Sequence, residues 1–250
     1  MKTTAGIERE RFIVDLRNDK IIPGIGRLLT SVWDKVQGNG CSTDLFGYEL
    51  FAGQVEDRTP PCDSLEALRK ALVANDNILN EAVSQFGWGF DFSEFAEEWR
   101  IRELAVNPFN ERHKRIWASI SPERRLAASR VAAIHVHIAI GKKLAAQALG
   151  LCDRETVNRL IKLGDHSQGK RIEAYRIMSQ SDGIPPKFSS RVELMRYIQQ
   201  HGGERNVWDL ARYKPSTGTI EFRMFGTTGD IQEIIGYVEA CLQVVAPLLH

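Results

Sequence analysis

The sequence has few cysteines, no excess of either charge and no long apolar run. Its four cysteines show no C-x-x-C spacing, which predicts reduced thiols and a cytoplasmic location; they are Cys41, Cys62, Cys152 and Cys241. With 33 basic and 32 acidic residues the net charge is +1, so we expect no bulk binding of nucleic acid or of an anionic membrane. No run approaches the ~20 apolar residues of a membrane helix. A strand predicted directly after Met1-Lys2-Thr3-Thr4 leaves no room for a signal peptide.

Two common kinds of catalytic motif are also missing. We find no convincing Ser-His-Asp or Cys-His arrangement, which argues against a covalent nucleophile. The segment Pro23-Gly24-Ile25-Gly26-Arg27 lacks the Lys-Ser/Thr ending of a phosphate-binding loop. At 250 residues, 43% of them hydrophobic and 26% charged, the chain is long enough for one large globular domain or two small ones.

The most informative stretch runs from Gly218 to Phe225 and alternates in the manner of a strand. Ile220, Phe222 and Met224 would face one side, whereas Thr219, Glu221, Arg223 and Phe225 would face the other. A carboxylate and a guanidinium two residues apart, about 7 Å along a strand, then point the same way.

Three further strand-like stretches place charged or metal-binding groups in alternating register. They are Gly6-Ile7-Glu8-Arg9-Glu10-Arg11, the segment 49–61 with Glu49, Gln54 and Glu56, and Ala133-Ile134-His135-Val136-His137-Ile138-Ala139. Four such stretches predict one sheet with a functional face. Glu49 has the opposite parity to Glu56, so either Gly53 marks a bulge or Glu49 lies in a turn before the strand. For the two histidines, contact with a metal or phosphate and a purely structural role in the core both stay open.

Helical periodicity and capping residues predict helices over residues 27–37, 64–85, 142–149, 153–163, 171–178 and 190–201, with further helices starting at Ser121-Pro122 and at Asp230. Residues 86–92 are aromatic and spaced by glycine, which suits either a loop packed on the core or a wall for a flat ligand such as adenine. Residues 100–130 are the most basic part of the chain. Solvated helix faces explain most of these cations, and one or two could contact polyphosphate.

Taken together and in order, these four stretches resemble the glutamate–cysteine ligase family, with its bacterial carboxylate–amine ligases, in the glutamine synthetase-like superfamily. Weaker matches are Tyr175-Arg176, Gly183-Ile184-Pro185-Pro186 and Trp208-Asp209. Related amidoligases share the His-x-His strand and the late Glu-Phe-Arg, and Phe225-Gly226-Thr227-Thr228 suits that branch better. The chain is also shorter than the typical bacterial ligase, mainly after the Glu221 strand.

The resemblance implies an α+β fold in which residues 1–250 form a single catalytic domain, with helices packed on an antiparallel sheet whose concave face binds ATP and Mg²⁺ or Mn²⁺. It further implies metal ligation by five carboxylates, Glu8, Glu10, Glu49, Glu56 and Glu221. His135 would lie near metal and phosphates, Arg223 would contact the transferred phosphate, and His137, where relatives vary, would bind cofactor at most.

The implied reaction phosphorylates a carboxylate with ATP and lets an amine attack the acyl phosphate, giving an amide, ADP and phosphate. The partners would be a small carboxylic acid, with glutamate and a γ-glutamyl product as candidates, and an amine or amino acid; a homo-oligomer is left open. Carboxylate clusters suit hard divalent cations, and this cluster would repel itself without metal. Two alternatives remain open: a zinc-dependent hydrolase that uses His135 and His137, and a non-catalytic nucleotide- or amino-acid-binding protein of the same fold.

Overall fold

The computed structural model describes residues 3–38 and 42–249, so the predictions made for Cys41 and for Met1-Lys2 lie outside the described residues. Its strands are β1 (Ala5–Asp15), β2 (Lys20–Ile21), β3 (Phe46–Tyr48), β4 (Gln54–Arg58), β5 (Trp88–Asp91), β6 (Ala133–Ala139), β7 (Ala211–Lys214) and β8 (Thr219–Gly226). Its helices are α1 (Ile25–Gly38), α2 (Leu65–Ser84), α3 (Glu111–Ser119), α4 (Pro122–Arg130), α5 (Ala145–Gly150), α6 (Arg154–Gly164), α7 (Lys170–Ser179), α8 (Arg191–Gln200) and α9 (Ile231–Val245). Short 3₁₀ turns η1 (Thr43–Leu45), η2 (Glu98–Arg100), η3 (Glu204–Asn206) and η4 (Ala246–Leu248) connect some of them.

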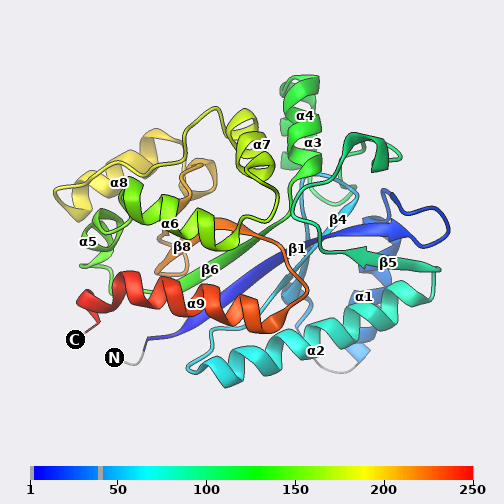
Figure 1. Cartoon of the computed structure of the whole chain (residues 1–250), viewed down its shortest axis with the longest axis horizontal. Helices are drawn as coiled ribbons and strands as arrows, with labels where there is room; N and C mark the ends of the chain where they lie inside the picture. Colours follow the sequence, from blue (N-terminus) through cyan, green and yellow to red (C-terminus); the bar gives the residue numbers. More distant parts are fainter. Residues whose placement is uncertain (1–2, 39–41, 250) are drawn as a thin grey trace.

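The strands form one antiparallel sheet in the order β3-β4-β1-β6-β8-β7, with β2 and β5 also pairing with β1. The four stretches singled out in the sequence therefore become four adjacent strands, β4, β1, β6 and β8 (Figure 1). The predicted fold class, helices packed on an antiparallel sheet, is confirmed.

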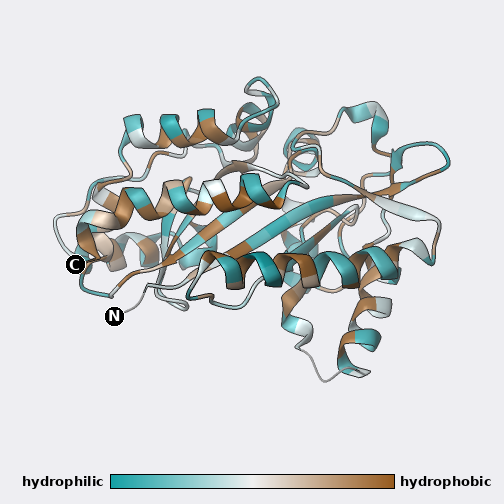
Figure 2. Ribbon diagram, turned by 60° about the horizontal axis from the view of Figure 1, so that its bottom comes forward, coloured by the Kyte–Doolittle hydropathy of each residue, from teal (hydrophilic) through white to brown (hydrophobic). Residues whose placement is uncertain are grey.

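One face of the sheet is covered by helices. Helices α2 and α9 lie side by side across it (Figure 1), and α5 and α6 extend the layer. The apolar residues that alternate along the central strands face this helical layer. Ile7 of β1, Val136 of β6 and Phe222 of β8 are examples, each at most 1% exposed. Hydrophobic and hydrophilic residues alternate along α2 and α9 (Figure 2), as expected for helices with one buried face.

The same helical face of β1 also buries two arginines beneath α2. Arg9 Nε and Nη2 donate to the two carboxylate oxygens of Asp57 at 3.1 Å, and Arg11 donates to the same carboxylate. Both arginines also bind Asp76 of α2, at 2.7 and 2.9 Å. These ion pairs hold Arg9 and Arg11 on the helical face of the sheet. Since side chains alternate along a strand, Glu8 and Glu10 must then lie on the opposite face.

A β-bulge interrupts the pairing of β6 with β8. Ile134 pairs with Phe225 and Val136 with Phe222, so Arg223 and Met224 both stand opposite His135. The bulge reverses the parity of the last residues of β8. The prediction that Phe225 faces the functional side is therefore wrong: Phe225 is buried and stacks on Tyr237 of α9, with 4.5 Å between ring centroids.

Three other expectations need correction or completion. Residues 88–91 form β5 rather than a loop. Glu49 follows β3 in the connection to β4, so the turn alternative holds and no bulge at Gly53 is needed. By length and composition the stretch Ile231–Leu248 could cross a membrane, although no apolar run of that kind was expected; here it packs on the sheet, and 44% of it is buried.

Candidate active site

The open face of the sheet gathers the predicted carboxylates and histidines. In register, Glu8 lies opposite His135, Glu10 opposite Glu56, and His137 opposite Glu221. Each pair comes from neighbouring strands and points away from the helical layer, because the residues between them fill the core. Positions 8, 10, 56, 135, 137 and 221, predicted from separate stretches, thus share one site.

His135 stands at the centre of this cluster. Its Nδ1 is 3.3 Å from Glu8 Oε2 and 3.7 Å from Glu221 Oε1, and its Nε2 is 3.7 Å from Glu10 Oε1. Two groups of possible metal ligands share this histidine: Glu8, His135 and Glu221 form one, and Glu10, Glu56 and His135 form the other. Within each group the ligand atoms lie within 4.8 Å of one another, so two cations could bind side by side.

The three remaining predicted residues, His137, Glu49 and Arg223, adjoin the same cluster. His137 Nε2 is 3.4 Å from Glu8 Oε1, and its Nδ1 is 3.2 Å from the hydroxyl of Thr219. Glu49 lies in the turn after β3 and interacts with the carboxylate of Glu56. Arg223 donates to Glu221. All eight predicted site residues are therefore brought together.

Four cations balance part of the negative charge, and of these only Arg223 had been selected from the sequence. Arg212 of β7 binds Glu221 with two nitrogens, at 2.6 and 3.0 Å, and Arg223 Nη1 donates to Glu221 at 2.5 Å. Lys214 Nζ is 3.4 Å from Glu8 Oε1, and Arg58 binds Glu56. The cluster is thus less self-repelling than the sequence suggested.

The uneven distribution of these cations divides the carboxylates into two kinds. Burial and the neighbouring Glu56 raise the pKa of Glu10 to about 8, and burial and Glu10 raise that of Glu49 to about 7. For Glu221 the burial is outweighed by Arg223 and Arg212, which hold its pKa far below its usual range. Burial and Arg223 lower the pKa of His135 to about 4, so its imidazole is neutral and able to bind a metal at pH 7.

The residues present fit a hard divalent cation. The donors are mostly carboxylate oxygens, which Mg²⁺ and Mn²⁺ prefer. Within the described residues, Glu56 Oε1, His137 Nε2 and Arg223 Nε are buried and have no hydrogen-bond partner, although Arg58 lies beside the first and Glu8 beside the second. Buried polar atoms are normally paired, so these three suit bound ions or phosphate oxygens.

A cleft of 660 Å³ opens above the cluster. Glu8, Glu49, Glu56, His135 and Arg223 form part of its lining. Tyr48 of β3, Arg112 and His113 of α3, Arg205 of η3 and the following Trp208 also line it. A smaller pocket of 240 Å³ adjoins Glu8 and His137 on the side of Gly6 and Thr219. Glu8 and Arg58 border both spaces, so ligands could meet at the cluster from two sides.

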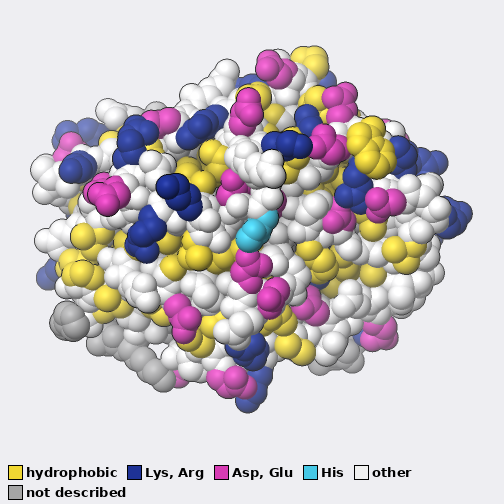
Figure 3. Space-filling view, in the orientation of Figure 1, with side chains coloured by type: hydrophobic (Ala, Val, Ile, Leu, Met, Phe, Trp, Pro, Cys, Tyr) yellow, Lys and Arg dark blue, Asp and Glu magenta, His cyan; other side chains and the backbone are white. Residues whose placement is uncertain are grey.

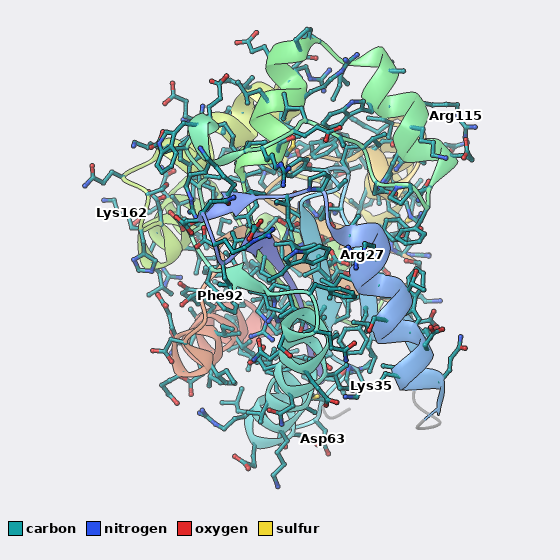
Figure 4. All side chains as sticks on the ribbon, turned by 90° about the vertical axis from the view of Figure 1, so that its right-hand side faces the viewer. Arg27, Lys35, Asp63, Phe92, Arg115 and Lys162 are labelled. Atoms are coloured by element: carbon teal, nitrogen blue, oxygen red, sulfur yellow. The ribbon has the colours of Figure 1, made fainter. Side chains whose placement is uncertain are left out.

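The basic segment is largely structural. Arg124 donates to the carbonyl of Met178, Arg130 to that of Ala96, and Arg115 extends outward from α3 (Figure 4). Arg112 is the exception, since it lines the cleft and donates to Asn206 across it. Residues 86–92 do not line the cleft, so the adenine interpretation of that stretch gains no support.

A family model supplies the decisive observation. The model of glutamate–cysteine ligase family 2 matches residues 4–149, which is more than half of the chain and includes β1, β4 and β6. The chain belongs to this family. Three of the four strands that build the site of this family 2 protein thus lie within the matched region, while β8 lies beyond it.

Solved structures share the fold over nearly the whole chain at low sequence identity. A bifunctional glutathione synthetase from Pasteurella multocida matches with a TM-score of 0.55 and 13% identity, covering 97% of this chain and 38% of its own. A glutamine synthase homolog matches with a TM-score of 0.52 and 13% identity, and the match covers 99% of this chain and 55% of the homolog. The glutamine synthetase of Plasmodium falciparum matches with a TM-score of 0.53 and 11% identity, and the match covers 98% of this chain and 52% of the synthetase. The family 2 chain thus spans between 38% and 55% of these proteins and shares their fold. No curated protein matches its sequence.

Sequence reasoning missed Arg212 and Lys214 because β7 was not predicted. A signal was present: both residues have the same parity in the run Ala211–Lys214, and Pro215-Ser216-Thr217-Gly218 then leads into β8. The hairpin sets Arg212 opposite Glu221. Arg58 lies in the segment 49–61, but nothing in one sequence shows which way its long side chain turns.

In this family 2 site, replacing His135 by alanine should reduce activity more than replacing His137. His135 contacts both candidate ligand groups, whereas His137 approaches only Glu8. Losing a ligand shared by two cations should lower turnover by about 100-fold or more, by analogy with the 10–100-fold losses seen even for residues behind metal ligands. Steady-state rates and thermal unfolding of both variants check this. Equal, mild rate effects with large losses of stability would return both histidines to a structural role.

The metal-free protein should lose stability as the pH rises from 6.5 to 8. In this window folded Glu10 and Glu49, with pKa values of about 8 and 7, still bind protons that the unfolded chain has released, so stability falls with pH. His135, with its lowered pKa, acts in the opposite direction only below pH 6.5. We expect the melting temperature to fall by about 5 °C, since one pKa unit equals about 1.4 kcal/mol and each kcal/mol shifts Tm by about 2–4 °C.

Thermal unfolding in EDTA and in excess Mg²⁺ tests this dependence. The fall should be present in EDTA and largely absent with Mg²⁺, because the bound cation keeps the carboxylates ionised at either pH. The same fall under both conditions would show that the carboxylates responsible do not hold the metal.

Proposed function

We propose that this chain is an ATP-dependent carboxylate–amine ligase that forms an amide bond through an acyl phosphate and releases ADP and phosphate. The observation that supports this most is the convergence of Glu8, Glu10, Glu56 and Glu221 around His135, with Arg223 directly beside them. Membership of glutamate–cysteine ligase family 2 is consistent with this kind of reaction.

The proposed cofactor is Mg²⁺ or Mn²⁺, held by Glu8, Glu10, Glu49, Glu56 and Glu221 together with His135. A bound divalent cation would supply positive charge against the phosphate oxygens. The protein holds the ligands in place through the strand register and through the ion pairs of Arg9 and Arg11 behind the sheet.

Arg223 would neutralise charge on the transferred phosphoryl group. One of its nitrogens is fixed by Glu221, and its Nε has no partner within the described residues, so part of the guanidinium is left for a phosphate oxygen. His135, His137 and Lys214 lie on the same face and could contact the nucleotide phosphates. No side-chain nucleophile is needed, because the phosphorylated substrate is itself the activated species.

The substrates would be a small carboxylic acid, for which glutamate is the first candidate to test, and an amine or amino acid. The 660 Å³ cleft is large enough for a nucleotide, and the 240 Å³ pocket on the far side of Glu8 suits a smaller molecule. On the face shown in Figure 3, basic and acidic side chains are interspersed, which suits a protein without a nucleic-acid partner. We expect the reaction to take place in the cytoplasm, which supplies ATP and Mg²⁺.

The most direct test of the proposed function is incubation with ATP, Mg²⁺ and pairs of amino acids. Phosphate release coupled to a product mass equal to acid plus amine minus water would support the ligase. Tightly retained zinc with hydrolysis in the absence of nucleotide would support a hydrolase instead. Binding of ATP without ADP release across a broad panel would support a non-catalytic binding protein.

An isotope experiment tests the proposed acyl phosphate. If the acid is phosphorylated, one oxygen of its carboxylate leaves with the phosphate when the amine attacks. Acid carrying ¹⁸O in that carboxylate should give inorganic phosphate with one labelled oxygen and ADP as the nucleotide product, measured by mass spectrometry. Label in AMP would indicate adenylation instead. Unlabelled phosphate during confirmed amide formation would rule out the acyl phosphate while leaving the fold unaffected.

A further inference from the structure

Two residues of α7 contact the bulge of β8. Arg171 and Tyr175 lie four residues apart, so they project from the same face of the helix one turn apart. They are 1% and 5% exposed. Neither belongs to the carboxylate cluster, and neither lines the 660 Å³ cleft.

Arg171 binds the backbone of the bulge. Its Nη2 donates to the main-chain carbonyl of Met224, one of the two residues that stand opposite His135. A bulge leaves backbone groups outside the regular ladder, and a buried carbonyl without a partner would cost about 1–3 kcal/mol. Arg171 therefore stabilises the bulged conformation directly.

Tyr175 binds the side chain that the bulge presents. Its hydroxyl donates to the carbonyl of Trp208 at 2.7 Å, and the same oxygen interacts with the Arg223 guanidinium, whose pKa it raises. Since a phenol oxygen has one hydrogen to donate and lone pairs that attract a cation, both contacts can be made together. Arg223 is thus held between Glu221 on its own strand and Tyr175 on α7.

Glu94 in turn holds Arg171 in place. Its guanidinium lies 3.7 Å from Glu94, measured from Nε to Oε2, and the other oxygen of Glu94 accepts from the backbone amides of His166 and Ser167 in the loop before α7. Glu94 Oε2 lies against Gly226, where a Cβ would stand only 1.5 Å away. The end of β8 therefore needs glycine for Glu94 to reach Arg171.

From these contacts we propose that Arg171 and Tyr175 are positioning residues for Arg223: Arg171 sets the backbone of the bulge, and Tyr175 sets the direction of the guanidinium. The effect on phosphoryl transfer rests on the proposed function, whereas the effect on Arg223 itself does not. Ordinary core packing would explain burial of both residues. It does not explain why Arg171 directs a guanidinium nitrogen at Met224 and Tyr175 directs its hydroxyl at Arg223, which are the two residues of the bulge.

A double-mutant cycle tests the link to catalysis. Tyr175→Phe and Arg171→Met should each lower kcat by about 10–100-fold, the usual range for residues that orient a functional group, with KM for ATP within about twofold. Arg171→Lys, which keeps a donor for the carbonyl, should recover most of the loss. In an Arg223→Lys background, Tyr175→Phe should cost less than about twofold, because the group that it orients is already absent. A full additional loss in that background would overturn the proposal.

A second measurement does not depend on turnover. The NMR signal of the Arg223 Nε–H group, assigned by its loss in Arg223→Lys, should show hydrogen exchange at least tenfold faster in Tyr175→Phe and Arg171→Met. Gly226→Ala should act in the same way, since its φ lies outside the left-handed region and the three atoms nearest to an added Cβ all belong to Glu94. The matched control is Arg124→Met: Arg124 also donates to a main-chain carbonyl, that of Met178, and in the part of the chain that the structure describes its side chain makes no hydrogen bond to a strand.

The two measurements separate the two proposals. Absence of any ligase product in the parent protein would overturn the proposed function, and the exchange rates would still decide the positioning role. Unchanged exchange in both α7 variants, or an equal change in Arg124→Met, would overturn the positioning role whatever the activity.

Discussion

Replacing Arg223 by lysine is expected to lower kcat by about 10²–10³-fold, the size of effect seen when one preorganised donor to a developing negative charge is removed. Lysine keeps the charge but loses the planar guanidinium, which here binds Glu221 and Tyr175 while leaving Nε free for a phosphate oxygen. Because that contact should strengthen as the phosphoryl group is transferred, the affinity for ATP should change little. Steady-state kinetics and equilibrium binding of ATP check both parts.

Arg124→Lys is the control, since Arg124 lies outside the sheet and binds only a main-chain carbonyl. It should keep the parent kcat. If Arg223→Lys changes KM for ATP and leaves kcat intact, the guanidinium binds the nucleotide equally in the ground state and in the transition state, and its proposed role is wrong.

Glu10→Gln and Glu221→Gln should both abolish most of the activity but should move the stability of the metal-free protein in opposite directions. Glu10 has a pKa of about 8 because it is buried beside Glu56, so removing its charge relieves an unfavourable ionisation at pH 8.5. Glu221 binds Arg212 and Arg223, and its neutral replacement leaves both guanidiniums undercompensated. Breaking a buried ion pair costs about 3–5 kcal/mol, which corresponds to a melting temperature about 6–20 °C lower.

Thermal unfolding in EDTA at pH 8.5 measures this contrast, with Glu239→Gln on the exposed side of α9 as the control. We expect Glu10→Gln to raise the melting temperature and Glu239→Gln to leave it unchanged. A lower melting temperature for Glu10→Gln would mean that the metal-free protein stabilises the ionised form of Glu10. The raised pKa of Glu10 predicts the opposite.

Much of the fold and most of the site could be predicted from local patterns. Alternation in β1, β6 and β8 assigned the correct face to Glu8, Glu10, His135, His137 and Glu221, because the buried residues between them are all apolar or internally paired. Capping residues located the starts of three helices: Ser121 caps α4, Ser190 caps α8 and Asp230 caps α9.

The errors arose where tertiary contacts decide the outcome. The bulge that turns Phe225 toward α9 depends on pairing with β6 and on Arg171 in a distant helix, and neither leaves a local signal. The contact of Tyr175 with Arg223 likewise joins segments almost 50 residues apart. Tyr175 belongs to one of the weaker matches to the family, but the sequence alone could not identify Arg223 as its partner. Long cations such as Arg58 and Lys214 can turn in many directions, so only the structure shows which carboxylate each one binds.

The strand order also has a consequence for how the protein reaches its native state. Strand β1 ends at Asp15, but its central neighbour β6 begins only at Ala133, and β8 follows after residue 218. Pairings of such long sequence separation fold slowly. During synthesis at about 5–20 residues per second, the first strand would wait roughly 6–24 s for its partner. Over that interval the buried positions of β1 are covered by β2, β4, β5 and the early helices, without β6. Aggregation of nascent chains should therefore be most sensitive to substitutions that weaken the β1–β4 pairing or the ion pairs of Arg9 and Arg11 with α2.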